Sequence, residues 1–519
     1  MSILIVTIVA AVLLAIPAYY LWIWTYWMRR GVRGPRGRPF VGVLDELLEH
    51  EKPGMIKLGE WTKEYGRVYG ITDGTQRTLV VADAEMVHEI FVKQFDNFFG
   101  RKLNPIQGDP EKDQRVHLLA AQGHRWKRLR TISAPSFTHG SLRKLKETVE
   151  DSAFEFLRHV EKMTAGGKQI DMLAAYQEVT MDVIGRIAMG QTDSQMFRNP
   201  ILPLVREIFC GKRKNLMLVC QVFPSVGRAL RDLTFKFPRL GSPAFKLYSF
   251  MDEAVKRRIA QRENDVAKGV ELGEPHDFID LFLDASSDVD FGAEANEDFS
   301  RRHMRVTRQL TAEEVVGQCF LFLIAGFDTT ALSLSYATWL LATNPRVQDK
   351  VREEMERECP GAEVEFEQLG RLKYTECMLK EALRMFPLAS IANSRRCMRT
   401  TSVKGVEIEA GTYVQADTWT LHYDPKIWGD DVDEFRPERW ESSSEELLEH
   451  KGAYLPFGLG PRQCIGMRLA LMEQKLVLTH VLKRYTLRPG SLTRIPLKLV
   501  GSATTSPEDV FLHLEPRHC

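Results

Sequence analysis

Several features that define common protein classes are missing from this 519-residue chain. The formal net charge is only +1, so no basic excess predicts nucleic acid or a strongly acidic partner. The eight cysteines include no C-x-x-C pair, which argues against a disulfide framework and favours reduced, mostly buried thiols. No internal repeat or low-complexity tract interrupts the chain. The sequence therefore predicts one large folded unit with a well-buried core.

Charge is also absent from one long stretch, because no charged residue occurs from Ser2 to Met28. This run ends in a Trp/Tyr cluster and is followed by five arginines between positions 29 and 38. A bilayer core requires about 20 apolar residues, so residues 1–28 are predicted to be an N-terminal transmembrane helix, even with Pro17 inside it. A cleaved signal peptide is the alternative, but it requires a basic start and a shorter apolar run. The arginines predict that the rest of the chain lies in the cytoplasm.

Beyond this anchor, the pattern predicts a basic Pro/Gly hinge at 29–39 and one domain at 40–519. The domain is expected to be mainly α with small β-sheets, one of them starting from a hairpin at Asp73-Gly74. The apolar segment 215–226 is either a lipid contact or an ordinary buried helix and turn. The acidic segment 284–299 is expected to be a solvated loop.

A single long helix is predicted to follow the capping box Thr311-Ala-Glu-Glu314 and to continue to Asn344. It is apolar on nearly every side, so it belongs inside the protein. Asp328 and Thr329 lie at its centre, where an ionisable group is costly unless it has a partner or a function. They either act on a ligand or satisfy each other at a local kink.

The loop FGLGPRQCIG, Phe457 to Gly466, holds one cysteine among three glycines. A lone cysteine is more often a core residue than a reactive one. Here, however, Arg462 and the start of the following helix would both favour the thiolate form of Cys464. A thiolate in a loop that allows close approach suits ligation of a heme iron.

With these segments together, the chain resembles the cytochrome P-450 superfamily of heme-thiolate monooxygenases. FGLGPRQCIG matches the F-x-x-G-x-R-x-C-x-G signature at every fixed position, and AGFDTT (325–330) resembles the oxygen-binding helix. KEALR matches the E-x-x-R helix, FRPERW resembles the arginine segment packed against it, and GHRWKRLR contains W-x-x-x-R. Three further segments look closest to the branch of the drug-metabolising family three enzymes and thromboxane synthase: WKRLRTISAPSFTHGSLRKL, YQEVTMDVIGRIAMG and HDFIDLFLDA.

The resemblance implies the cytochrome P-450 fold and specific roles for residues at matching positions. Heme b (iron protoporphyrin IX) would be the cofactor of the domain at 40–519, with Cys464 as its axial thiolate ligand, and Asp328 and Thr329 would deliver protons during oxygen activation. The remaining implied roles fall into three groups: heme-binding Arg462, Trp126, Arg130 and Phe457; a structural network of Glu381, Arg384 and Arg439; and a substrate pocket that includes Ala325, Leu388, Ala389 and Thr504.

One stretch departs from the family pattern. Many relatives carry a basic propionate contact soon after the E-x-x-R helix, but here the sequence is PLASIANSRR. Either a propionate is held differently or Arg395 takes that place. On spacing alone, the Glu381–Arg384 pair could equally be a surface ion pair of little energetic value.

The implied function is a membrane-anchored monooxygenase that inserts one atom of O2 into a lipid, steroid or xenobiotic. Electrons would come from NADPH through cytochrome P-450 reductase, with cytochrome b5 as a further partner, at the endoplasmic reticulum membrane. Arg125, Lys127 and Arg128 are candidates for a reductase-docking face, or for an ordinary solvated helix face. Two other classes remain open: a thiolate-heme isomerase or dehydratase that acts on a peroxide without a reductase, and a non-catalytic heme-binding sensor or carrier.

Overall fold

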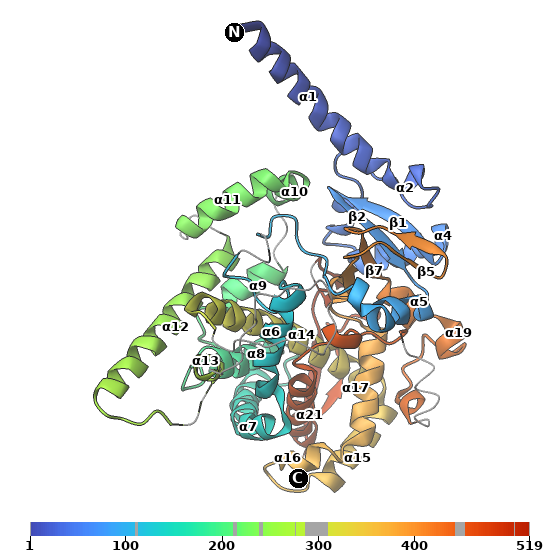
Figure 1. Cartoon of the computed structure of the whole chain (residues 1–519). Coiled ribbons are helices and arrows are strands. Elements are labelled where there is room, and N and C mark those ends of the chain that lie inside the picture. The colour runs from blue at the N-terminus through green and yellow to red at the C-terminus, as the bar shows by residue number, and fades with distance from the viewer. Residues whose placement is uncertain are drawn as a thin grey trace.

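The computed structural model describes residues 2–108, 113–210, 215–237, 242–273, 277–285, 310–441, 452–502 and 504–517, with positions 110 and 275. Figure 1 shows a helical part built around the long helix α14 and a smaller part that contains the largest sheet. Helix α1 projects away from this body and ends at the N-terminus. The expected fold class, mainly α with small sheets, is confirmed.

Helices make up most of the described chain. Those before the central helix are α1 (Ser2–Trp24), α2 (Tyr26–Arg29), α3 (Leu44–Leu47), α4 (Gly54–Tyr65), α5 (Ala84–His88), α6 (Gly123–Ser133), α7 (His139–Met163), α8 (Met172–Ala188), α9 (Leu202–Cys210), α10 (Asn215–Val222), α11 (Pro224–Lys236), α12 (Pro243–Ala267) and α13 (Phe278–Asp284). The others are α14 (Ala312–Thr343), α15 (Pro345–Glu358), α16 (Phe366–Leu369), α17 (Lys373–Met385), α18 (Thr418–His422), α19 (Pro425–Trp428) and α21 (Met467–Arg484).

The largest sheet has four strands in the order β1-β2-β7-β4. These are β1 (Val68–Asp73), β2 (Gln76–Val81), β7 (Tyr413–Ala416) and β4 (Ser394–Arg396). Strands β1 and β2 form the expected antiparallel hairpin, in which Asp73 lies opposite Gln76. Gly74 in its turn has φ 62°, a conformation that glycine adopts without a steric cost.

Three smaller sheets complete the described strands. They are β5 (Thr401–Val403) with β6 (Val406–Ile408), β9 (Leu499–Val500) with β10 (Ser506–Pro507), and the sheet β3 (Ile170–Asp171), β11 (Phe511–Pro516) and β8 (Tyr485–Arg488). Because β3 precedes α8 while β8 and β11 follow α21, this last sheet joins chain segments more than 300 residues apart.

Helix α14 begins at the predicted capping box. Thr311 Oγ1 accepts a hydrogen bond from Glu314 N at 3.2 Å, and Glu314 Oε2 accepts one from Thr311 N at 3.2 Å. Within the described residues, α14 is the helix that is long and apolar enough to cross a membrane, yet 72% of its most apolar window is buried in the protein. It is therefore a core helix, and it packs against α8, α12 and α21.

The C-terminal end of α1 and the helix α2 pack against the body. Trp27 donates from Nε1 to the Ile71 carbonyl at 2.8 Å, and its ring lies so close to Gly70 that a Cβ there would be 2.2 Å from it. Tyr26 is also buried and donates to Glu409 at 2.7 Å. Part of the predicted anchor thus belongs to the core around the largest sheet.

The predicted hinge also contacts this sheet, since Gly70 N donates to the Arg33 carbonyl at 2.8 Å. The division into an anchor at 1–28, a hinge at 29–39 and a domain at 40–519 remains a prediction. Helix α1 is 23 residues long and includes the apolar stretch Leu14–Trp24.

The apolar segment 215–226 forms α10 and the start of α11. It exposes the side chains of Leu216, Val219, Phe223 and Val226, whereas Val222 is buried. Tyr20 of α1 donates to the Val222 carbonyl at 2.5 Å. Most of the acidic segment 284–299 lies outside the described residues.

Candidate active site

Cys464 lies in a tight loop between a short 3-10 helix, Gly460–Arg462, and α21. Its backbone N–H donates to the carbonyl of Phe457, a half-buried residue, at 2.8 Å. Gly460 has φ 71°, and a Cβ there would lie 2.2 Å from the Phe91 carbonyl oxygen. No other residue type fits this close approach without strain. The glycine therefore fixes the path that places Cys464 ahead of α21.

The thiol of Cys464 lies among protein atoms although its side chain is exposed. Burial raises the pKa of this thiol, while the backbone N–H groups of Gly466 and Met467 and the cations Arg130 and Arg101 lower it. An exposed side chain in an enclosed position faces an interior space. The N–H groups and the two arginines favour the thiolate form, whereas burial favours the thiol.

Four arginines gather beside this loop: Arg101, Arg130, Arg395 and Arg462. Burial and the other three guanidinium groups together lower the pKa of Arg462. Buried cations of this kind normally have acidic partners. Among the described residues, no carboxylate forms an ion pair with any of the four.

Each arginine of this cluster uses part of its guanidinium group on backbone carbonyls. Arg462 donates to Phe99 O and Ala121 O, and Arg130 donates to Gln463 O at 2.7 Å. Nη1 of Arg462 and Nε of both Arg101 and Arg395 are buried without a hydrogen-bond partner. The cluster thus presents unused donors where an anionic group would be stabilised.

Trp126 of α6 supports the cluster from one side. It is 5% exposed, and the Arg462 guanidinium carbon lies 4.3 Å from the centre of its ring. This is the geometry of a cation–π contact. The structure therefore brings together Cys464, Phe457, Arg462, Arg130 and Trp126, and their heme-binding roles remain predictions.

Asp328 and Thr329 lie in the middle of α14. Asp328 is 1% exposed and accepts a hydrogen bond from Thr504 Oγ1 at 2.8 Å. Burial raises the pKa of Asp328 to about 6, against the hydrogen bonds from Thr504 and Gln177. Thr329 donates from Oγ1 to the Ala325 carbonyl at 2.7 Å.

The predicted substrate-pocket residues differ in their surroundings. Ala325 is exposed although it lies in a core helix, and Ala389 is half-buried. Leu388 is buried, and its carbonyl accepts from Thr505 N at 2.9 Å. Thr504 is 9% exposed and its hydroxyl is committed to Asp328. Of these four, Ala325 and Ala389 have accessible surface, whereas Thr504 holds the carboxylate of Asp328.

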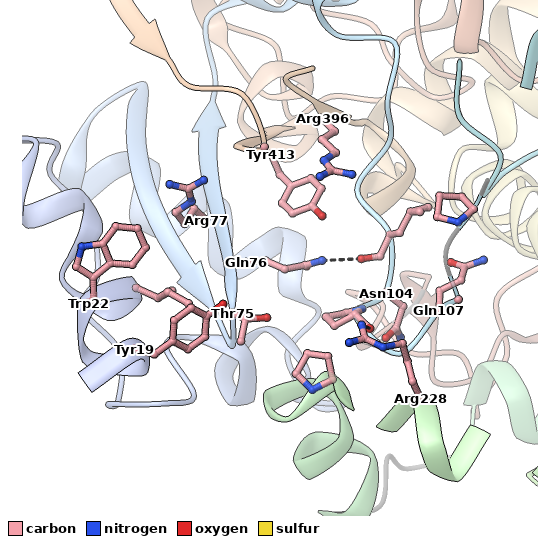
Figure 2. Close-up of a pocket in the computed structure, with 17 residues that line it drawn as sticks. Tyr19, Trp22, Thr75, Gln76, Arg77, Asn104, Gln107, Arg228, Arg396 and Tyr413 are labelled. Carbon is pink, nitrogen blue, oxygen red and sulfur yellow. Dashed lines mark hydrogen bonds between the residues drawn. The ribbon is translucent and has the colours of Figure 1, made fainter. Parts of the chain in front are cut away.

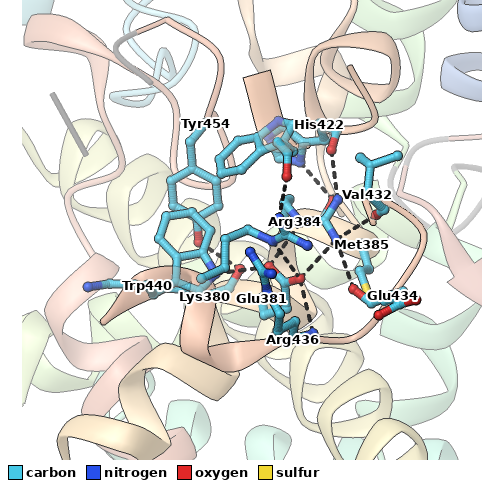
Figure 3. Close-up of polar contacts among 12 residues, drawn as sticks. Lys380, Glu381, Arg384, Met385, His422, Val432, Glu434, Arg436, Trp440 and Tyr454 are labelled. Carbon is cyan, nitrogen blue, oxygen red and sulfur yellow. Dashed lines mark hydrogen bonds and ion pairs between the residues drawn. The ribbon is translucent and has the colours of Figure 1, made fainter. Parts of the chain in front are cut away.

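Glu381 and Arg384 form a buried ion pair on α17, and both are 0% exposed. Figure 3 shows the carboxylate of Glu381 surrounded by donors. Arg384 donates to it from Nε and Nη2 at 2.9 Å, and Arg439 donates from Nε at 3.2 Å. Trp440 Nε1 and the Arg436 backbone complete the set at 2.9 and 3.3 Å. The structure thus joins the three predicted network residues.

The comparison with known proteins agrees with this arrangement. A family model described as cytochrome P450 matches residues 32–513. The chain belongs to the cytochrome P450 family. It is 74% identical over 508 residues to cytochrome P450 CYP13A2 of Caenorhabditis elegans, with 98% of both chains covered. It is also 57% identical over 516 residues to CYP13A5 of the same organism, with 99% of both covered.

Membership of the P450 family makes this chain an enzyme with a heme-thiolate cofactor. The residues present fit that group. The unused donors of the arginine cluster match the two carboxylates of a porphyrin's propionates in charge and chemistry. Cys464 is the exposed thiol in the same enclosed region.

The sequence motifs indicate Arg395 only as an alternative and miss Arg101. Arg395 on β4 is 1% exposed and lies near Arg462, which supports the alternative that it takes the place of the missing basic contact. Arg101 has no recognisable motif, and it donates to the carbonyl of Arg462, 361 positions away. The residues around Arg101 form no pattern that predicts a contact with a residue so distant in the sequence.

The suggested reductase-docking residues behave differently from the expectation. Arg125 and Arg128 both pair with Glu314, at 3.4 and 2.7 Å, and their side chains are only 17% and 15% exposed. These two arginines hold α6 to the start of α14. The single carboxylate of Glu314 offsets one of the two positive charges, and both side chains are mostly covered, so Arg125 and Arg128 are not freely projecting surface charges. A docking role for this helix stays a prediction.

Proposed function

We propose that this P450 is a membrane-anchored monooxygenase that inserts one atom of O2 into an apolar small molecule such as a lipid, steroid or xenobiotic. Electrons come from NADPH through cytochrome P-450 reductase, and cytochrome b5 is a second donor. The enzyme resides in the endoplasmic reticulum membrane with its domain on the cytoplasmic side. The branch of family three and thromboxane synthase remains the expected placement.

The observation that carries this proposal is the buried carboxyl group in α14. Heme supplies dioxygen binding and reductive activation when it is bound to Cys464. Protons must then reach a site from which bulk water is excluded. Asp328, with a pKa of about 6, can both hold and release a proton near neutral pH. Thr504 fixes its orientation through the 2.8 Å hydrogen bond.

The neighbouring Thr329 is the second group of this path. Its hydroxyl lies one residue from Asp328 and on the same helical face as Ala325, to whose carbonyl it donates. Helix α14 is also joined to α21, which starts just after Cys464, because Ser333 donates to Gln474 at 2.7 Å. The acid and the hydroxyl thus lie on one helix, and the loop that holds Cys464 leads into a second helix packed against it.

The test is reconstitution of the full-length enzyme with reductase and NADPH. Lipids, steroids and xenobiotics are first screened for a shift of the heme spectrum, and the best ligand is then assayed for product. Product that forms without NADPH or reductase would overturn the monooxygenase assignment in favour of an isomerase. No product from any ligand that shifts the spectrum would favour a sensor or carrier.

A matched pair of variants tests the proton path. Thr329→Ala should lower the ratio of product to NADPH consumed, with more electrons ending as hydrogen peroxide, since acid–base groups contribute about 100-fold to 10,000-fold. Thr343→Ala is the control, because Thr343 makes the same kind of hydrogen bond on α14, to the Trp339 carbonyl at 2.8 Å. Equal ratios in both variants would contradict the role of Thr329.

A further inference from the structure

A pocket of about 530 Å³ lies where α1 meets the body of the enzyme. Figure 2 shows it between the anchor helix, the β1–β2 turn, the loop after Leu103 and the start of α11. It shares no residue with the Cys464 site. The side chains that matter below are Tyr19, Trp22, Arg77, Arg228, Arg396 and Tyr413.

The polar lining of this pocket is basic. Arg77, Arg228 and Arg396 contribute to it, and none of its described lining residues is acidic. Arg396 follows Arg395 on β4, and successive side chains of a strand point to opposite faces. Arg395 therefore joins the heme-site cluster while Arg396 points into this pocket, as Figure 2 shows.

Arg396 has little to neutralise it. Its Nε is buried without a hydrogen-bond partner, and its guanidinium carbon lies 5.9 Å from the ring centre of Tyr413. Arg228 is exposed, and it donates only weakly, to the Pro105 carbonyl at 3.4 Å. Neither arginine forms an ion pair with a described carboxylate.

Two acids close to lining residues already have cationic partners. Glu409 pairs with both Arg30 and Arg77, and Asp73 pairs with Lys102 at 2.7 Å. Glu409 therefore offsets the charge of Arg77, but neither acid pairs with Arg228 or Arg396 among the described residues. The pocket retains positive charge that an anion would stabilise.

The wall formed by α1 is apolar and aromatic. Tyr19 and Trp22 line the pocket and are still 53% and 52% exposed. Aromatic residues of this kind are typical of the boundary between membrane and water. From here α1 leads away from the body (Figure 1). An occupant could therefore place an anionic group among the arginines and an apolar chain along α1.

We infer that this pocket binds the phosphate headgroup of an anionic membrane phospholipid. Guanidinium groups bind phosphate with paired, planar hydrogen bonds, and the pocket volume is within the range of small-molecule sites. The inference rests on the proposed membrane position of α1 but concerns a site separate from the heme. The bound lipid would hold the anchor against α11 and the β1–β2 turn, and so fix how the enzyme sits on the membrane.

The test is native mass spectrometry of the full-length heme enzyme in detergent, which counts bound lipid molecules. Three probes are titrated: phosphatidic acid, phosphatidylcholine of the same chain length, and inorganic phosphate. Arg396→Gln and Arg228→Gln are compared with Arg257→Gln, which removes the same charge from an exposed position on α12. The spectrum of the reduced carbonyl complex checks folding, because Arg396 adjoins Arg395.

One phosphatidic acid should bind more tightly than phosphatidylcholine, and Arg396→Gln should weaken it about tenfold, as expected for a lost charge-assisted hydrogen bond. Arg257→Gln should bind like the unmodified enzyme. Equal affinity in all three variants, or equal binding of the two lipids, would overturn the inference. Inorganic phosphate binding as tightly as phosphatidic acid would also overturn it, by showing a site for soluble anions. Arg228→Gln keeps the test decisive if Arg396→Gln fails to fold.

Discussion

Removal of the Glu381 carboxylate should be one of the most destabilising single changes in this enzyme. Glu381 is fully buried and accepts hydrogen bonds from Arg384, Arg439, Trp440 and the Arg436 backbone. Glu381→Ala removes the only carboxylate that Arg384 pairs with among the described residues. Arg384 is itself 0% exposed, so water could not solvate its charge after the carboxylate is removed.

The expected magnitude follows from that burial. Breaking a buried ion pair by removing one partner costs about 3–5 kcal/mol. A domain is typically stable by about 5–15 kcal/mol, so this loss is a large share of the total. Arg384 keeps the bonds from Nη1 to the His422 carbonyl and from Nη2 to the Val432 carbonyl, but its Nε loses its acceptor and its charge loses its partner.

An exposed pair of the same spacing provides the control. Asp349 and Arg352 also form an i,i+3 ion pair on a helix, but their side chains are 55% and 18% exposed. Asp349→Ala should change stability by no more than about 0.5 kcal/mol. The comparison separates the effect of burial from that of ion-pair spacing.

The assay is chemical unfolding of the heme enzyme, followed by circular dichroism and heme absorbance. Glu381→Ala should lower the midpoint sharply or prevent accumulation of heme protein, and Glu381→Asp, which keeps the charge but shortens the side chain, should have a smaller effect. A loss of less than about 1 kcal/mol for Glu381→Ala would refute the argument from burial.

Three other changes test separate parts of the structure. Cys464→Ser should abolish the thiolate-type band of the reduced carbonyl complex, because an alcohol is a poor iron ligand; a retained band would identify another ligand. Burial raises the pKa of Asp328 to about 6, so the stability from its bound proton is present below pH about 4 and lost as pH rises through about 6. Asp328→Asn should remove this dependence in unfolding measured from pH 4 to 7, and an unchanged pH profile would argue against it. Deletion of residues 2–18 should reduce membrane association without loss of heme, whereas Trp27→Ala should cost about 3–5 kcal/mol; a Trp27→Ala variant as stable as the unmodified enzyme would show that the anchor separates at Met28.

The local features of the fold could be predicted from the sequence because each depends on neighbouring residues. The capping box at Thr311 fixes the start of α14, and the Asp73-Gly74 turn fixes the β1–β2 hairpin. The glycines around Cys464 define a loop that comes close to other backbone. Backbone conformation, periodicity and turn chemistry operate over a few residues, so they are visible in the sequence itself.

Contacts between distant segments were decided only by the tertiary structure. Arg101 meets Arg462 across 361 positions, and Trp27 is buried against Gly70 although it ends an apolar run that looks like an anchor. Arg125 and Arg128 look like surface charges until Glu314 is brought beside them. Whether a charge is solvated, paired or left for a cofactor depends on what lies around it in space. The sequence by itself determined the local motifs, including the loop that presents Cys464. The packing of remote segments determined which arginines are paired with carboxylates and which remain unpaired beside that loop.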